Sequence, residues 1–216
     1  MPLKRAVLPL LDHIEPLAAE VGAANTVVFA AGRRHGHNTD VPGLLAALAE
    51  RGVTGSSLPP TPAVLILGAG ATARSALAAL RALGITQATV AARTPTRAGD
   101  LLATADRLGI KITLTPFGAP HDQPDLLIST VPAGAADPYA QRIAARTFLP
   151  PRVLDIVYHP WPTPLTTAAR QSGALVADGF DLLLHQAAGQ FQLMTGSPAP
   201  LDPMRTAGLA ALAERG

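Results

Sequence analysis

The sequence predicts an α/β fold built on a parallel sheet, and three observations carry that prediction. Beyond residue 62, short apolar runs of strand length alternate with helical patterns. Glycine ends two of those patterns, at Gly84 and Gly109, as is common just past a helix. The 216-residue chain is 48% apolar, with a mean hydropathy of +0.27, which supports a buried core.

The elements follow one another in a regular order. Residues 52–62 mix glycine, serine and proline and predict a linker. Residues 63–67 form a continuous apolar run, typical of a strand buried on both faces. Further strands are expected at 88–92, 110–114, 126–129, 153–157 and 175–177, and helices at 73–83, 97–108, 137–146, 164–171, 180–194 and 203–214. Because strands alternate with helices, we expect parallel strands joined by right-handed crossovers.

Composition excludes several classes of function. Aromatic residues make up 4% of the chain and the net charge is +2, which disfavours a base-stacking nucleic-acid binder. The absence of cysteine excludes disulfides, thiolate zinc sites and a cysteine nucleophile. No apolar run approaches a membrane span, and Asp12 ends the first apolar stretch too early for a signal peptide. We therefore expect a soluble, cytoplasmic protein without nucleic-acid or membrane partners.

A glycine-rich turn follows the first predicted strand and opens a helix, with the sequence Gly68-Ala69-Gly70-Ala71-Thr72-Ala73. This fits the dinucleotide fingerprint G-x-G-x-x-A in its strand–turn–helix context. Gly68 permits the tight turn, and Gly70 lets a pyrophosphate approach the backbone amides at the helix start. The alternative is an ordinary glycine-rich turn. The position of the glycine turn at the start of an α/β repeat favours cofactor binding.

The end of the second predicted strand indicates which dinucleotide binds. Arg93, Thr94 and Arg97 lie where an NAD site usually has an acid for the ribose hydroxyls. Guanidinium groups suit a 2′-phosphate in charge and geometry, so the sequence predicts NADP rather than NAD. In the alternative, Arg93 and Arg97 are a solvated helix start. Cations there oppose the helix macrodipole, which disfavours that interpretation.

Motifs along the whole chain, in order, resemble the shikimate dehydrogenase family. Those of the N-terminal part resemble V-T-x-P-x-K, G-A-x-N-T and x-N-T-D, at Met1-Pro2-Leu3-Lys4, Gly22-Ala23-Ala24-Asn25-Thr26 and His37-Asn38-Thr39-Asp40. Among the later motifs, residues 68–73 resemble the family's glycine turn, and residues 92–97 resemble N-R-T-x-x-R with Ala92 in place of Asn. Residues 129–132 resemble N-A-T-P, residues 155–165 resemble D-x-x-Y-x-P-x-x-T-P-L, and residues 178–187 resemble N-G-x-x-M-L-x-x-Q-A.

The resemblance implies an NADP-dependent reduction of 3-dehydroshikimate to shikimate in aromatic amino-acid biosynthesis. It assigns the proton donor to Lys4 with Asp40 as its partner, and the sequence does not decide which of the two carries the proton. The substrate hydroxyls would be bound by Asn25, Asp40, Tyr158 and Gln186, and the cofactor also by Thr130, Ile156 and Gly179. The alternatives are a solvated terminal lysine for Lys4 and a helix N-cap before 41–49 for Asp40. Asn25 could likewise be a turn residue and Gln186 a helix-surface residue.

The resemblance also predicts a domain organisation. Residues 1–53 would be part of an α/β substrate domain completed by helices in 181–216, and residues 54–180 a Rossmann-like NADP domain. The family's S-x-S motif and the Thr of V-T-x-P-x-K are missing, so we expect a late-assigned start or a truncated product. A homodimer is one expected assembly. Two alternatives remain open, a quinate/shikimate dehydrogenase and a non-catalytic NADP-binding module.

The chain has six histidines, which are candidate metal ligands. His35 and His37 are the only close pair, and no third histidine follows at ligand spacing. We therefore expect a solvated turn at 35–37 and no metal site.

Overall fold

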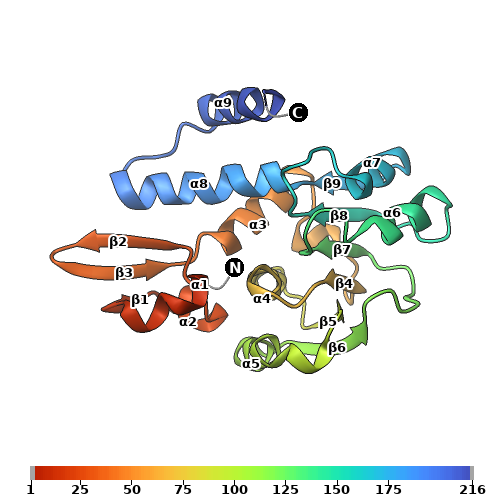
Figure 1. Cartoon of the computed structure of the whole chain (residues 1–216), viewed down its shortest axis with the longest axis horizontal. Helices are drawn as coiled ribbons and strands as arrows, with labels where there is room; N and C mark the ends of the chain where they lie inside the picture. Colours follow the sequence, from red (N-terminus) through yellow and green to blue (C-terminus); the bar gives the residue numbers. More distant parts are fainter. Residues whose placement is uncertain (1–2, 215–216) are drawn as a thin grey trace.

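The structure, a computed structural model, describes residues 3–214, apart from the side chain of Arg97. Met1 and Pro2, the first residues of the N-terminal motif, lie outside the described residues. The described residues fold around two sheets, one of six strands and one of three (Figure 1).

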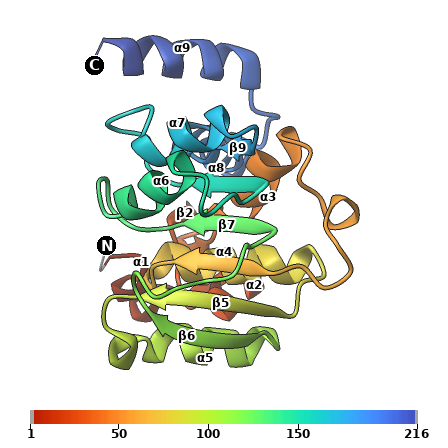
Figure 2. The ribbon, with the colours of Figure 1, turned by 90° about the vertical axis from the view of Figure 1, so that its right-hand side faces the viewer.

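The six-stranded sheet is parallel throughout, in the order β6-β5-β4-β7-β8-β9 (Figure 2). Its strands are β4 (Val64–Leu67), β5 (Gln87–Ala92), β6 (Lys111–Pro116), β7 (Leu126–Ser129), β8 (Arg152–Asp155) and β9 (Leu175–Ala177). The chain runs outward from β4 to β6 and then returns to β7 beside β4, so the sheet is doubly wound. The strand order reverses between β4 and β7, where sheets of this kind bind ligands.

Helices cover both faces of this sheet. Helices α4 (Ala71–Ala82) and α5 (Gly99–Leu108) lie on one face, and α6 (Asp137–Ala144) and α7 (Pro164–Gln171) on the other (Figure 1). All four residues of β4 are buried. Ile66 belongs to the core formed with α4 and α5, whereas Leu65 and Leu67 belong to the core formed with α6 and α7. This alternation explains why the strand is apolar at every position.

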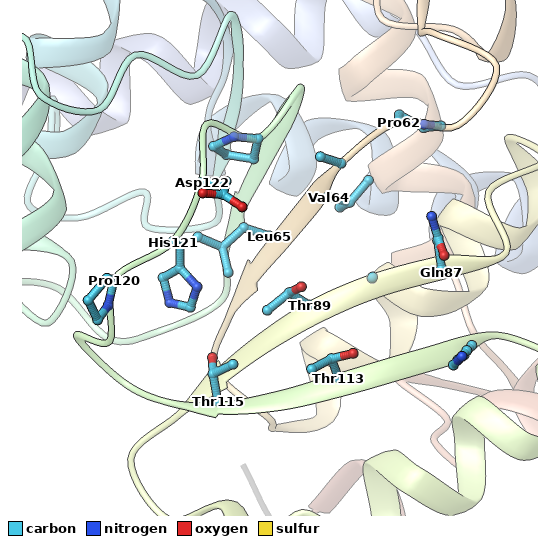
Figure 3. A pocket seen from close by; sticks show the side chains of 14 residues that line it. Pro62, Val64, Leu65, Gln87, Thr89, Thr113, Thr115, Pro120, His121 and Asp122 are labelled. Carbon is cyan, nitrogen blue, oxygen red and sulfur yellow. The ribbon is translucent and has the colours of Figure 1, made fainter.

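The crossover from β6 to β7 carries no helix. Residues 117–125 contain Gly118, Pro120 and Pro124, which disfavour a helix. A pocket of about 460 Å³ lies over β4, β5 and β6 beside this crossover, and Thr89, Thr113 and His121 line it (Figure 3).

The small sheet has the order β1-β3-β2, with strands β1 (His13–Ile14), β2 (Thr26–Ala30) and β3 (Arg33–His37). Ala31 and Gly32 join β2 to β3, both with positive φ, as in a tight antiparallel hairpin. Around it lie α1 (Leu3–Ala6), the 3-10 helix η1 (Leu8–Leu10) and α2 (Pro16–Val21). The expectation of a solvated turn at His35 and His37 is wrong, because both residues pair with β2 as part of β3.

Helix α3 (Asp40–Glu50) packs between α4 and α8 (Gly179–Thr195). The approach to α8 is close at Gly43, where a Cβ atom would lie 3.0 Å from the Gln186 amide nitrogen. The last helix, α9 (Leu201–Ala213), contacts α8, and Arg205 reaches back to Glu50 of α3 at 2.7 Å. The domain boundaries expected at residues 53 and 180 stay predictions.

The elements expected beyond residue 62 are present, with shifted ends. The helix expected from residue 73 starts at Ala71, because Gly70 is its N-cap. The helix expected from residue 97 starts at Gly99, because Pro95–Arg97 form a separate 3-10 helix, η3. The strand expected to reach residue 157 ends at Asp155. The linker expected at 52–62 contains the 3-10 helix η2 (Gly55–Ser57). Within residues 3–214, none of the helices has the length and hydropathy that a membrane span requires.

Candidate active site

Lys4 and Asp40 form a shielded ion pair. The Lys4 Nζ atom donates to Asp40 Oδ2 at 2.5 Å, and the two side chains are only 18% and 3% exposed. The backbone carbonyl of Lys4 accepts from the amide of Ala24, which anchors the short helix α1 beside the start of β2. The alternative of a solvated terminal lysine is therefore wrong.

The alternative of Asp40 as a helix N-cap is also wrong. Asp40 is the first residue of α3, and the N-cap position belongs to Thr39. Asn38 supplies the acceptor at this helix start, since its Oδ1 atom accepts from the Val41 amide at 3.1 Å. The Asp40 carboxylate is thus free to bind side chains.

Asn25 joins this ion pair through its side-chain amide. Its Nδ2 atom donates to Asp40 Oδ1 and to Thr39 Oγ1, each at 2.9 Å, while its Oδ1 atom accepts from the Thr39 amide at 2.9 Å. Gln186 approaches from α8, with Oε1 at 3.5 Å from Asn25 Nδ2. The structure therefore brings together Lys4, Asn25, Asp40 and Gln186, which come from four separate parts of the chain. Gln186 is half-buried against this cluster rather than on an open helix surface.

Thr39 orients Asn25, a role that the motif resemblance does not assign to it. Its amide and hydroxyl contact opposite ends of the Asn25 side-chain amide, which fixes the orientation of that group. The signal was available, because Thr39 lies inside the motif at 37–40.

Tyr158 does not join the cluster. Its side chain is 45% exposed and lines a pocket of about 360 Å³ with Trp161 and with Leu209 of α9. Within residues 3–214, no hydrogen bond links it to the Lys4 and Asp40 pair. Its role in substrate binding stays a prediction.

The glycine turn has the geometry that the fingerprint predicts. Gly68 has a φ of +98°, and a Cβ atom there would lie 2.7 Å from the Thr130 hydroxyl oxygen. That hydroxyl donates to the Leu67 carbonyl at 2.7 Å and fixes the end of β7 against the turn. Around Gly70, by contrast, no heavy atom would lie within 4 Å of a Cβ. The backbone at the start of α4 is therefore open to a ligand, and its first amides, at Ala71 and Thr72, lack partners within the helix.

The arginines of the second strand lie at the same end of the sheet. Arg93 and Thr94 follow directly after β5 and are exposed, so both side chains are open to a ligand. The side chain of Arg97 lies outside the described part of the structure. An exposed guanidinium beside the glycine turn fits a dinucleotide with a 2′-phosphate.

Two further cofactor candidates lie close together. The Ile156 amide donates to the Ser129 carbonyl at 3.1 Å, which places residue 156 beside the end of β7. A Cβ atom at Gly179 would lie 2.4 Å from the Ile156 carbonyl oxygen, so only glycine fits there. Asp155, the residue before Ile156, is buried, and burial raises the pKa of its carboxyl, while the hydrogen bond from the Thr163 hydroxyl at 2.8 Å opposes that rise. Because Thr163 is also the N-cap residue of α7, the hydrogen bond between Thr163 and Asp155 holds the start of this helix against the end of β8.

Side chains of α4 and α5 bind the N-terminal segment to the six-stranded sheet. Arg74 donates to the Gly22 carbonyl at 3.1 Å, Thr104 to Val21 at 3.2 Å and Arg107 to Glu20 at 3.0 Å. These carbonyls lie at the end of α2, where no intrahelical partner is available. Figures 1 and 2 both show α1 and α2 beside α4. Asn25 is three residues beyond Gly22, so these contacts hold the cluster close to the helix that the glycine turn opens.

Comparisons with known proteins agree with this arrangement. Residues 179–207 match the family model of the shikimate 5'-dehydrogenase C-terminal domain. The chain is 38% identical to the NADP(+) shikimate dehydrogenase of Citrifermentans bemidjiense, over 100% of this chain and 76% of that protein. It is similar to the crystal structure of Mycobacterium tuberculosis shikimate dehydrogenase, with a TM-score of 0.79 at 37% identity, over 98% of this chain and 76% of that one. A Thermus thermophilus shikimate 5-dehydrogenase in complex with NADP(H) and shikimate gives a TM-score of 0.78 at 35% identity, over 98% and 77%.

Proposed function

The chain belongs to the shikimate dehydrogenase family, and from this premise we propose how its own residues carry out the reaction. The reaction is the reversible, NADP-dependent reduction of 3-dehydroshikimate to shikimate. A ketone gains a hydride at carbon and a proton at oxygen, and the reverse reaction removes both. When bound, NADP supplies or accepts the hydride.

NADP would be held at the carboxyl ends of β4, β5 and β7. The amides of Ala71 and Thr72 would bind the pyrophosphate, with Gly68 and Gly70 providing the space and Ala69 completing the turn. Arg93, Thr94 and Arg97 would bind the 2′-phosphate. Thr130, Ile156 and Gly179 would contribute to the nicotinamide side. The observation that supports this assignment is the open backbone at Gly70 beside an exposed Arg93.

Lys4 transfers the proton, and Asp40 positions Lys4. Both oxygens of Asp40 already accept hydrogen bonds, Oδ2 from Lys4 and Oδ1 from Asn25, and the carboxylate is 3% exposed. Lys4 uses one N–H on Asp40 and keeps its remaining N–H groups for a substrate oxygen. In the reductive direction, the ammonium donates a proton to that oxygen as the hydride reaches carbon. This short ion pair is the observation that carries the proposal.

Asn25 and Gln186 bind the hydroxyl groups of the substrate. A side-chain amide both donates and accepts, which suits a ring with several hydroxyls. Thr39 fixes the orientation of the Asn25 amide. Both N–H groups of that amide already donate, to Asp40 Oδ1 and Thr39 Oγ1, so a substrate hydroxyl would take the place of one of these partners. Tyr158 would join them only from a different position of its loop.

The test is a turnover assay on two lysine variants. Lys4→Met removes the proton carrier, and we expect the rate of shikimate oxidation to fall by about 10²–10⁴-fold. Lys111→Met is the matched control, because Lys111 lies on β6, far in sequence from the cluster, and its loss should leave the rate unchanged. NADPH affinity should be equal in both variants and the parent chain. An unchanged rate in Lys4→Met would contradict the role of Lys4.

Two outcomes separate the remaining alternatives. A chain that binds NADPH but gives no substrate-dependent change in its absorbance would be a binding module without turnover. Faster oxidation of quinate than of shikimate would identify a quinate/shikimate dehydrogenase. A homodimer and a cytoplasmic location stay predictions, which light scattering and cell fractionation would test.

A further inference from the structure

The register of the small sheet brings three metal-ligating side chains together. Strand β1 runs parallel to β3 with His13 directly opposite His35, and the two imidazole centroids lie 5.5 Å apart. Glu15 follows His13 by two residues, and Glu15 Oε1 lies 3.2 Å from His13 Nε2. One ligand atom from each of the three residues lies within 4.8 Å of the other two.

The distances suit a small divalent cation. Zinc binds imidazole nitrogen and carboxylate oxygen at about 2.0–2.2 Å in a tetrahedron, so neighbouring ligand atoms are about 3.3–3.6 Å apart. The His13 to Glu15 separation of 3.2 Å is already close to that length. The ligand atom of His35 lies within 4.8 Å of the ligand atoms of His13 and Glu15, and rotation of this partly exposed side chain can close that gap.

We propose that His13, Glu15 and His35 form a binding site for a zinc-class divalent transition metal. Two imidazoles and one carboxylate favour Zn²⁺, Ni²⁺ or Cu²⁺ over Mg²⁺ and Ca²⁺, which prefer oxygen ligands. His13 and Glu15 are 53% and 39% exposed, so water completes the coordination and the ion can enter from solvent. The site goes beyond the proposed function, because the hydride and proton transfers do not use it.

A metal here would strengthen the weakest pairing of the small sheet. Strand β1 pairs with β3 through only two residues, His13 with His35 and Ile14 with Gly36. An ion bound to both strands links them directly, and binding to the folded chain alone stabilises it. The same sheet continues into β2, which begins directly after Asn25. Zinc binding should therefore raise the unfolding temperature without being required for turnover.

The competing interpretation is an ordinary ion pair between His13 and Glu15. An ion pair needs a protonated imidazole, whereas a metal needs a neutral one. Metal affinity should therefore be higher at neutral than at acidic pH, because protons compete with the metal for its ligands. A pH-independent uptake of zinc would point to other ligands.

The experiment is calorimetric titration of the tag-free, chelator-treated chain with zinc chloride, and with magnesium chloride as the comparison. We expect one zinc ion per chain and no magnesium binding. His35→Gln and Glu15→Gln should each weaken zinc binding by at least about 10–100-fold. His37→Gln is the matched control, since it lies on the same strand two residues farther on, and it should bind zinc like the parent chain.

Cobalt substitution gives a second readout that does not depend on activity. Co²⁺ bound by two imidazoles should show a visible absorption band, and this band should disappear in His35→Gln. Circular dichroism identifies a variant that has lost its fold. If His35→Gln does not fold, Glu15→Gln tests the metal site instead, because Glu15 lies outside both strands. The proposal is overturned if the parent chain binds no zinc, or if zinc binding survives unchanged in both folded ligand variants.

Discussion

The two sheets of this molecule are stabilised in different ways. All four residues of β4 are buried and face helices on both sides, whereas only one of the five residues of β2 is buried. The large sheet therefore has a buried core on each of its faces. The small sheet depends on a hairpin, on the ion pair of Arg34 with Asp12 and on contacts with α8, and the neighbouring α2 docks on α4 and α5.

This difference assigns separate tasks to the two regions. The cofactor residues lie at strand ends of the well-packed sheet, where backbone positions are fixed by burial. Lys4 and Asn25 lie in the region that is held by docking contacts. Substitutions that loosen the docking should therefore slow proton transfer while leaving cofactor binding intact.

The largest effect is expected from a pair of truncations, one in each sheet. Ile66→Ala removes a fully buried side chain of β4 and should lower the free energy of unfolding by about 2–5 kcal/mol. Val28→Ala in β2 removes a partly exposed side chain and should lower it by much less. Urea denaturation of both variants measures the difference. Equal losses would show that the small sheet has a comparable core.

The next effect concerns the cofactor end of the large sheet. Arg93→Ala should weaken NADPH binding by about 10–100-fold, because a charge-assisted hydrogen bond contributes about 1.5–3 kcal/mol. NADH binding should not change. Arg33→Ala, an exposed arginine of β3, is the control. Fluorescence titration measures the affinity of both variants for both dinucleotides. A parallel loss of NADH affinity in Arg93→Ala would show that Arg93 does not bind the 2′-phosphate.

A smaller effect is expected at the junction between the two regions. Arg74→Met removes the hydrogen bond to the Gly22 carbonyl and should cost about 1–2 kcal/mol of stability. Turnover should fall more than NADPH affinity, because Asn25 follows this contact by three residues. Arg81→Met is the control, since Arg81 lies on the same helix and donates to the Leu108 carbonyl within the large-sheet region. Similar kinetics for the two variants would show that the junction does not position the cluster.

The sequence predicted the large sheet well because its signals are local. The apolar run at 126–129 coincides with β7, and the glycine turn adopts the backbone that its residue types favour. The ion pair of Lys4 with Asp40 was proposed from motif resemblance alone, since the two residues are 36 positions apart.

The small sheet gave no such signal. Strand β3 consists of arginines, histidines and one glycine, so its sequence lacks the alternation of a half-buried strand. The pairing of His13 with His35 depends on two residues of β1 and on tertiary packing. Tyr158 likewise lines a pocket together with Leu209 of α9, which comes from the far end of the chain.

The smallest effect distinguishes a buried carboxylate of the large sheet from an exposed one at the end of α3. Burial raises the pKa of Asp155 from its usual 3.8, so the folded chain binds this proton more tightly than the unfolded chain. Its contribution to stability is therefore complete below 3.8 and is lost as the pH rises through the folded pKa. Burial also acts on Glu50 in α3, but hydrogen bonds from Arg205 and His185 outweigh it and lower that pKa, so the contribution of Glu50 is lost as the pH falls.

Asp155→Asn isolates the contribution of Asp155 to the pH dependence of stability. The variant keeps an acceptor for the Thr163 hydroxyl but does not titrate, so the fall in stability between pH 3.8 and neutrality that Asp155 causes should disappear. Urea denaturation at several pH values, with Glu50→Gln as the comparison, measures both slopes. Glu50→Gln should instead reduce the loss of stability on the acidic side. If Asp155→Asn leaves the curve unchanged, the strain of a buried charge is not present at the end of β8.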